Sequence, residues 1–298
     1  MRAKQISLFE VGARDGLQNE RAVPLEAKIA LINALAEAGV KRIETGSFVS
    51  PKWVPQMADS QAVFAGITRH TGVRYSALTP NMQGLAGAID ARADEVAVFA
   101  SASEAFSQRN INCSIEESIE RFIPLIDKAK QLNLPVRGYV SCTLGCPYEG
   151  EIAVSEVVRV SEILYKLGVY EISLGDTIGI GTPDKARNML KAVAEKVPVE
   201  QLALHFHDTR GQALANILAC LDTGVSTIDT SVAGLGGCPY AKGASGNLAS
   251  EDLVYMLHGM GIETGIDLLK LAHAGHEISR VLGRPSGSKV ALALGKPE

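Results

Sequence analysis

The sequence predicts an α/β fold, a (β/α)8 TIM barrel followed by extra C-terminal helices. The main observation is a regular alternation of short apolar, β-branched stretches with longer stretches of helical periodicity. The length of 298 residues fits one such domain, which we expect to span residues 1–298. A doubly wound sheet is the alternative, but the first βα turn, V-G-A-R-D-G-L, lacks the G-x-G-x-x-G spacing of dinucleotide-binding folds.

Eight stretches are expected to be parallel strands, because they are short, apolar and rich in β-branched residues, as strands covered on both faces are. Each precedes a stretch of helical periodicity, so the helices are expected to surround the closed sheet. The expected strands are Gln5–Val11, Arg42–Thr45, Arg74–Leu78, Glu95–Ala100, Val136–Ser141, Glu171–Leu174, Leu202–Phe206 and Thr227–Ser231.

The expected helices have recognisable starts and ends. Gly39, Gly168 and Gly224 stand just beyond three of them, where glycine commonly ends a helix. Ser114 and Glu117 have the spacing of a capping box at the start of another. The helices are Pro24–Ala38, Gln56–Thr68, Met82–Ala91, Ser114–Leu132, Ser155–Leu167, Pro183–Lys196 and Arg210–Thr223, with Ser250–Met260 and Ile266–Leu282 as the additional C-terminal pair.

Composition and charge exclude several classes of protein. The formal net charge of −4 argues against general nucleic-acid binding, which requires a basic face. No run approaches the roughly 18 apolar residues of a membrane span, so we expect no membrane association. The N-terminus has no leader pattern, and five scattered cysteines do not form a disulfide framework, so we expect a reducing compartment, the cytoplasm.

The run Leu204–Thr209, L-H-F-H-D-T, is the first functional signal. Side chains two residues apart in a strand point to the same face, so His205 and His207 converge while Leu204 and Phe206 face the opposite way. Two convergent imidazoles at the end of a buried strand are typical of a metal site. The alternative is a pair of core histidines with ordinary hydrogen-bond partners.

Further polar residues follow the carboxyl ends of other expected strands, where the active sites of barrels of this kind lie. Asp15 follows the first strand, and Asn247 ends the glycine-rich segment after the eighth. Together with the two histidines they make a set of oxygen and nitrogen ligands without thiolate, which favours Mg²⁺ or Mn²⁺. Taken alone, Asp15 is also compatible with a turn carboxylate, and Asn247 with a turn amide.

Two more residues have functional and structural interpretations. We expect Arg14 to lie at the rim, with its guanidinium aimed at a developing oxyanion; the alternative is a simple salt bridge to Asp15. Cys238 lies between a glycine pair and Pro239, so loop closure would bring its thiol into the site. The alternative for Cys238 is a buried, inert thiol.

Four segments resemble the 3-hydroxy-3-methylglutaryl-CoA lyase family, and the resemblance extends from about residue 4 to about residue 290. They are V-G-A-R-D-G-L-Q-N-E (Val11–Glu20), Q-R-N-I-N-C-S-I-E-E-S (Gln108–Ser118), H-F-H-D-T (His205–Thr209) and S-V-A-G-L-G-G-C-P-Y-A-K-G-A-S-G-N (Ser231–Asn247). The last is very specific, whereas R-D-G and H-x-H occur in a wider superfamily. Ala13 departs from the proline common before R-D-G, and no cysteine follows Cys238.

The resemblance implies a role for each matching position. The ligands of a divalent metal would be Asp15, His205, His207 and Asn247. Arg14 would hold the thioester oxygen, and Cys238 would be the catalytic thiol. The base would be His205 or a metal-linked water. The substrate-binding positions would be Arg14, Gln18, Glu44, Asn110, Ser114 and Asp176, of which Glu44 and Asp176 support the metal ligands.

The implied reaction is cleavage of 3-hydroxy-3-methylglutaryl-CoA to acetyl-CoA and acetoacetate, as in leucine degradation, with an acyl-CoA as the ligand. We also expect a homo-oligomer. Three alternatives remain open at this point: the same cleavage of a longer 3-hydroxy-3-substituted glutaryl-CoA, a Claisen condensation, and a catalytically silent barrel that binds acyl-CoA.

Overall fold

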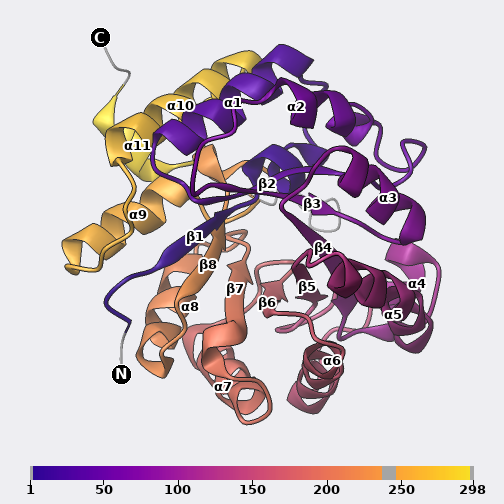
Figure 1. The fold of residues 1–298 in the computed structure, drawn as a ribbon. Helices are drawn as coiled ribbons and strands as arrows, with labels where there is room; N and C mark the ends of the chain where they lie inside the picture. The colour runs from indigo at the N-terminus through magenta and orange to yellow at the C-terminus, as the bar shows by residue number, and fades with distance from the viewer. Residues whose placement is uncertain (1–2, 237–245, 296–298) are drawn as a thin grey trace.

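The computed structural model describes residues 3–236 and 246–295. Within these ranges, eight parallel strands close into a barrel in the order of the sequence, each hydrogen-bonded to the next and the last to the first (Figure 1). The strands are β1 (Ser7–Glu10), β2 (Arg42–Ser47), β3 (Arg74–Leu78), β4 (Glu95–Ser101), β5 (Val136–Ser141), β6 (Glu171–Asp176), β7 (Leu202–Phe206) and β8 (Thr227–Thr230). The predicted barrel is confirmed, and the doubly wound sheet is wrong.

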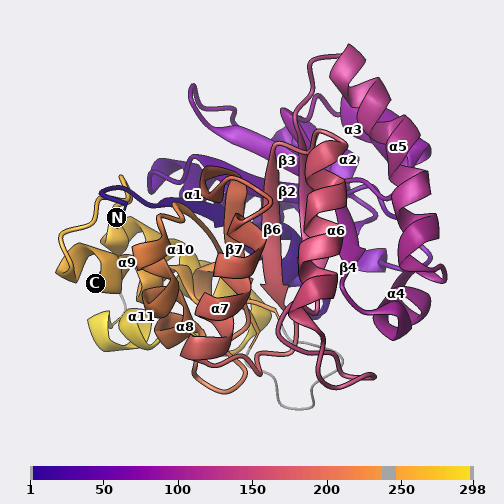
Figure 2. The ribbon, with the colours of Figure 1, turned by 90° about the horizontal axis from the view of Figure 1, so that it is seen from below.

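The helices pack around the outside of the barrel (Figures 1 and 2). They are α1 (Leu25–Glu37), α2 (Ser60–Gly66), α3 (Met82–Asp90), α4 (Glu104–Ile111), α5 (Ile115–Gln131), α6 (Val154–Lys166), α7 (Pro183–Ala194), α8 (Ala213–Cys220), α9 (Ser250–Gly259), α10 (Leu268–Leu282) and α11 (Lys289–Leu294). The sequence analysis missed α4 and α11. Among the described residues, no helix is long and apolar enough to cross a membrane.

Two expected helices are shorter than predicted. The segment Gln56–Thr68 divides into a 3-10 turn, Pro55–Met57, and α2. The helix expected from Arg210 begins at Ala213, because Gly211 has a φ of +67° and the Asp208 carboxylate accepts the Ala213 amide at 2.9 Å. The predicted capping box before α5 is present, with both reciprocal hydrogen bonds between Ser114 and Glu117.

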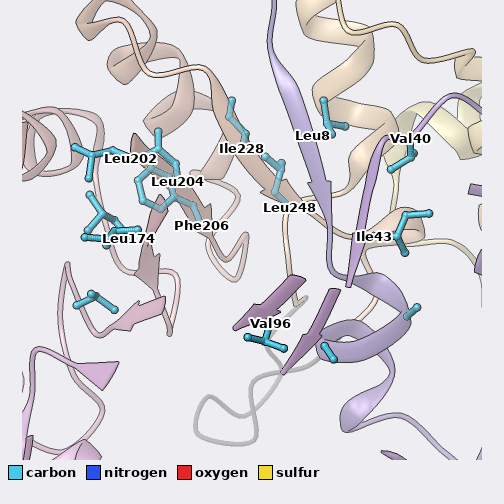
Figure 3. Packing of buried hydrophobic residues seen from close by; sticks show 14 of the residues in the cluster. Leu8, Val40, Ile43, Val96, Leu174, Leu202, Leu204, Phe206, Ile228 and Leu248 are labelled. Carbon is cyan, nitrogen blue, oxygen red and sulfur yellow. The ribbon is translucent and has the colours of Figure 1, made fainter. Parts of the chain in front are cut away.

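The main hydrophobic core lies between the strands and the surrounding helices. Alternate strand side chains, such as Leu204 and Ile228, face this layer and are fully buried (Figure 3). Each contributes about 1.5–3 kcal/mol relative to an exposed position. The four cysteines among the described residues are also buried and unpaired.

Several inward-facing side chains of the strands are charged. Arg42, Glu95, Arg137, Glu171 and Asp229 lie within the barrel, and the last four are no more than 3% exposed. In most barrels of this class, layers of branched apolar side chains fill this space. The two faces of the strands therefore differ in chemistry, since the outer faces form the apolar core and the inner faces carry charged groups.

The C-terminal helices are built onto the barrel beside α1, where α10 lies (Figure 1). Two buried carboxylates, one from β1 and one from α9, accept hydrogen bonds from the turn after β8, which precedes these helices. Glu10 accepts the amides of Gly12 and Val232 at 2.9 Å, and Glu251 of α9 accepts the Ala233 amide at 3.0 Å. A side chain at Gly275 of α10 would place its Cβ only 2.4 Å from the Glu251 carboxylate.

Burial raises the pKa of Glu251 to about 8 and that of Glu10 to about 7. At a pH above the ordinary carboxyl pKa, the folded protein keeps the protons of these two groups, whereas the unfolded chain releases them. The two groups therefore favour folding at low pH, and this contribution to stability is lost as the pH rises to about 8. We predict that Glu251→Gln flattens this dependence, by up to roughly 1.4 kcal/mol per pH unit, in urea-unfolding curves at about pH 5, 7 and 9. Glu120→Gln, at an exposed position of α5, is the control. Parallel profiles for wild type and Glu251→Gln would contradict the prediction.

Candidate active site

Three potential metal ligands meet at the carboxyl end of the barrel. Asp15 lies in the π-helical turn Gly12–Gly16 after β1, His205 lies in β7, and His207 follows β7 directly. One ligand atom from each residue lies within 4.8 Å of the other two. The expected convergence of the two histidines with Asp15 is therefore present.

The two imidazoles face each other as the strand alternation predicts. His205 Nε2 lies 3.4 Å from His207 Nε2, and the ring centroids are 5.4 Å apart. Leu204 and Phe206 point to the opposite face and enter the outer core (Figure 3). The sequence spacing thus aims both histidines at one point.

Asp15 is held on both sides. Its Oδ1 accepts Arg14 Nη1 at 2.9 Å, and its Oδ2 accepts Asn247 Nδ2 at 2.8 Å. Asn247 also pairs with His207 through an isolated β-bridge, which brings the predicted fourth residue against the other three. Burial opposes ionisation of Asp15, but the charge of Arg14 and the two histidines lower its pKa to about 2, so it is a carboxylate at neutral pH.

Arg14 is buried, so its expected position at the rim is wrong. It is 6% exposed, and its Nε donates to Glu44 Oε2 at 2.6 Å. Its guanidinium carbon lies 5.7 Å from the centre of the Tyr139 ring, and the Tyr139 hydroxyl donates to Glu44 Oε1 at 3.1 Å. The turn after β1 folds Arg14 inward onto the carboxylate of β2, and the alternative salt bridge with Asp15 is present as well.

The donor set fits a divalent cation. Among the described side chains, His207 Nδ1 is a buried atom with no hydrogen-bond partner. Burial, followed by the neighbouring His205, lowers the pKa of His207 to about 4, so its imidazole is neutral and has a lone pair to share. One carboxylate and two imidazoles, without a thiolate, are a donor set that a divalent cation can use.

The remaining predicted residues are placed in different ways. The Asp176 carboxylate accepts the amides of Ile180 and Gly181 at 3.1 and 2.8 Å, so it organises the turn after β6 and does not join the triad. Burial raises its pKa. Glu44, by contrast, supports the site through Arg14.

Three of the predicted substrate-binding positions lie outside the barrel strands. Asn110 is exposed on α4, Gln18 is half-buried, and Ser114 is the N-cap of α5, where its hydroxyl accepts the Glu117 amide at 3.1 Å. For these three residues, binding to substrate stays a prediction.

Cys238 lies outside the described residues. The described ends of its segment meet beside the triad. A Cβ at Gly246 would lie 1.6 Å from Gly236 O, and one at Gly236 would lie 2.9 Å from Asn247 Nδ2. Glycines at these two positions permit this close crossing, and both have positive φ.

Three residues of the site were missed by the sequence analysis. Asp229 contacts His205, Arg137 contacts Asp229, and Tyr139 contacts Glu44. The available signal was the presence of charged residues inside apolar strands, at Arg137 in V-R-G-Y-V-S and Asp229 in T-I-D-T. Their pairing depends on which strands adjoin in the closed barrel.

Curated relatives resemble this chain over nearly its whole length. A Pseudomonas aeruginosa protein named 3-hydroxy-3-isohexenylglutaryl-CoA/hydroxy-methylglutaryl-CoA lyase is 57% identical, with 98% of this chain and 97% of that protein covered. The cytoplasmic 3-hydroxy-3-methylglutaryl-CoA lyase of Danio rerio is 59% identical, with 97% and 86% covered. The mitochondrial hydroxymethylglutaryl-CoA lyase of Mus musculus is 58% identical, with 98% and 90% covered.

Solved structures agree with this relationship. The crystal structure of hydroxymethylglutaryl-CoA lyase from Pseudomonas aeruginosa has a TM-score of 0.97 and 56% identity, with 98% of both chains covered. An HMG-CoA lyase from Acinetobacter baumannii, in complex with coenzyme A and 3-methylmalate, has a TM-score of 0.93 and 41% identity, with 98% of this chain and 96% of that chain covered. The model of the HMGL-like family matches residues 5–278. This chain therefore belongs to the HMGL-like family.

Proposed function

We propose that this protein is a carbon–carbon lyase that cleaves 3-hydroxy-3-methylglutaryl-CoA to acetyl-CoA and acetoacetate. The observation that carries the proposal is the cluster of Asp15, His205 and His207 beside the buried guanidinium of Arg14. The names of relatives at 57 to 59% identity support this substrate and reaction. They favour it over a condensing synthase or a silent acyl-CoA binder.

Asp15, His205 and His207 would hold Mg²⁺ or Mn²⁺, with Asn247 adjoining. A divalent cation bound there would polarise the tertiary hydroxyl of the substrate and make its proton easier to remove. His205 Nδ1 already faces Asp229, so its Nε2 has one lone pair, for either the cation or a proton. We therefore assign His205 to ligation and leave proton removal to another group.

The cleavage moves one electron pair toward the thioester. The hydroxyl gives its proton to a base, for which a water molecule at the site is the candidate. The hydroxyl oxygen becomes the ketone of acetoacetate as the C2–C3 bond breaks. The released pair forms the enolate of acetyl-CoA, which takes up one proton to give the second product. Arg14 places a fixed positive charge where that enolate oxygen develops, and Cys238 is the proposed donor of the final proton.

One side of the barrel interior offers an apolar surface to the C3 substituent. Leu78 and Ala97 pack with Tyr139 in a small cluster, separate from the main core, and half-buried Val49 packs against it. A methyl group fits this chemistry, and so does a longer alkenyl chain. The second candidate is thus the same cleavage with a longer substituent, as the printed name of the Pseudomonas aeruginosa relative indicates for that protein. Acetyl-CoA release from a panel of both substrates measures the preference.

The proposal extends to the setting of the enzyme. We place it in the cytoplasm, in leucine degradation, and as a homo-oligomer. The four buried, unpaired cysteines of the described chain agree with a reducing compartment. Light scattering coupled to size-exclusion chromatography measures the oligomeric state directly.

We predict that removal of divalent ions abolishes turnover and that Mg²⁺ or Mn²⁺ restores it, because one carboxylate and two imidazoles converge within 4.8 Å of one another. A coupled assay for acetyl-CoA, with and without EDTA, makes the measurement. Full activity in a preparation shown by elemental analysis to be free of metal would overturn the proposed site.

Arg14→Met is predicted to affect stability and turnover separately. Among the described residues, it leaves buried Glu44 with the Tyr139 hydroxyl as its remaining hydrogen-bond partner, so we expect a loss of about 3 kcal/mol in the free energy of unfolding. Adding Glu44→Gln removes the unpaired acid and should restore most of that stability. Turnover should stay about 10²–10³-fold low in both variants. Recovery of turnover together with stability in the double variant would show that Arg14 has a purely structural role.

Cys238→Ala should lower kcat strongly and leave the affinity for Mn²⁺ nearly unchanged, because the proposed ligand set contains no thiolate. Steady-state kinetics and isothermal titration calorimetry give the two quantities, and Cys113→Ala is the matched control at a buried thiol on a helix boundary. A parallel fall in metal affinity would make Cys238 a ligand and the proposed donor set wrong.

A further inference from the structure

His205 has a buried partner that the proposed reaction does not use directly. Asp229 of β8 lies beside it in register, 1% exposed, and Asp229 Oδ2 is 3.2 Å from His205 Nδ1. A carboxylate accepts hydrogen bonds and donates none, so the proton of a neutral His205 must reside on Nδ1. The lone pair is then on Nε2, the nitrogen that faces His207.

The carboxylate of Asp229 is itself fixed in direction. Arg137 donates two hydrogen bonds to this carboxylate, from Nη1 to Oδ2 at 2.9 Å and from Nη2 to Oδ1 at 2.7 Å. Ser173 donates to Oδ2 at 2.8 Å. Two parallel charge-assisted bonds define the plane of the carboxylate as well as its position. Asp229 can therefore turn neither away from His205 nor toward another donor.

Arg137 is immobilised in turn. Its Nε donates to Glu171 Oε1 at 2.7 Å, and its guanidinium carbon lies 4.0 Å from the centre of the Phe9 ring and 4.9 Å from that of Tyr139. Glu171 also accepts two bonds from Arg42, at 2.7 and 2.9 Å. A continuous line of ion pairs thus crosses the barrel and ends at His205.

The energetics of buried ion pairs favour a functional reason for this series of charged side chains. Isolated ions are costly to bury, and a well-packed apolar substitute for a buried ion pair is often as stable or more stable. Stability alone would therefore not require Arg137 and Asp229 in a barrel interior. A fixed acceptor behind a histidine, in contrast, sets its tautomer and orientation, which apolar side chains cannot do.

We infer that Asp229, held by Arg137, is a positioning residue that fixes His205 as its Nδ1-protonated tautomer and directs Nε2 toward the cation site. The inference rests on the proposed metal site, but the tautomer can be measured in metal-free protein. Failure of the two ideas is therefore distinguishable.

The test combines Asp229→Asn with Glu95→Gln as its matched control. Glu95 is a buried carboxylate in the same barrel, bonded to the Tyr170 hydroxyl at 2.5 Å. Both variants convert a buried acid into its amide, but only the first touches His205. In Asp229→Asn, one of the two oxygens that accept Arg137 becomes an amide nitrogen, which meets a donor in either orientation and loosens the acceptor beside His205 Nδ1. The preference of the imidazole proton for Nδ1 should therefore weaken.

Three measurements are made on each protein: long-range ¹H–¹⁵N correlation of the imidazoles at about pH 8, Mn²⁺ affinity by calorimetry, and urea unfolding. His205→Gln assigns the relevant resonances. We expect Nδ1–H alone in the wild type, a measurable share of Nε2–H in Asp229→Asn, and a 10- to 100-fold loss of Mn²⁺ affinity in that variant. Glu95→Gln should keep both the tautomer and the affinity.

If Asp229→Asn does not fold, Arg137→Met with Asp229→Leu replaces the ion pair by apolar groups and still removes the acceptor. This double variant should remain folded and bind Mn²⁺ more weakly than the wild type. An Nε2–H tautomer in the wild type, an unchanged tautomer in Asp229→Asn, or an equal affinity loss in Glu95→Gln would each overturn the inference. If the wild type binds no divalent cation, the proposed metal site fails, and the tautomer data alone decide the role of Asp229.

Discussion

The geometry of the site depends on the guanidinium of Arg137, which is fully buried and bonded to Asp229 and Glu171. A charge in that position cannot be hydrated, so its donors must meet acceptors from the neighbouring strands. Three of its nitrogens do so, and two aromatic rings, Phe9 and Tyr139, cover the guanidinium. The strands β5, β6 and β8 are thereby tied together by directional bonds at the level beneath the metal ligands.

This constraint explains why the two faces of the strands are so different. The outer faces carry residues such as Val96 and Ile172, whose burial against the helices is non-directional and tolerates small adjustments. The inner faces carry Arg137, Glu171 and Asp229, whose hydrogen bonds tolerate almost none. Apolar packing supplies the stability of the barrel, and the ion pairs supply the fixed positions that chemistry at its mouth requires.

The sequence predicted what depends on local pattern. Strand boundaries agree with the structure to within a few residues, and the convergence of His205 and His207 follows from the two-residue repeat of a strand. The helix α4 was missed because E-A-F-S-Q-R-N-I is mostly polar and weakly periodic. These outcomes share one cause, since each depends on residues near one another in the chain.

Pairings between distant segments could not be read in the same way. The position of Arg14 was wrong because its partner Glu44 lies 30 residues away on the next strand. Asp229 was missed because its contact with His205 exists only once β7 and β8 adjoin in register. Asp176 is the last residue of β6, where a site residue is expected, yet its carboxylate accepts backbone amides of the loop that follows. Hydrogen-bond geometry decides that orientation, and residue spacing does not predict it.

The same contacts explain how a guanidinium can stand next to a cation site. Arg14 and a divalent ion would repel each other, and both would compete for the charge of Asp15. Glu44 is fully buried and lies 2.6 Å from Arg14, so it balances the guanidinium from the side away from Asp15. The charge of Asp15 then remains available to the cation, while the hydrogen bond to Glu44 holds Arg14 in place. Glu44 thus supports Asp15 without touching it, through its hydrogen bond with Arg14.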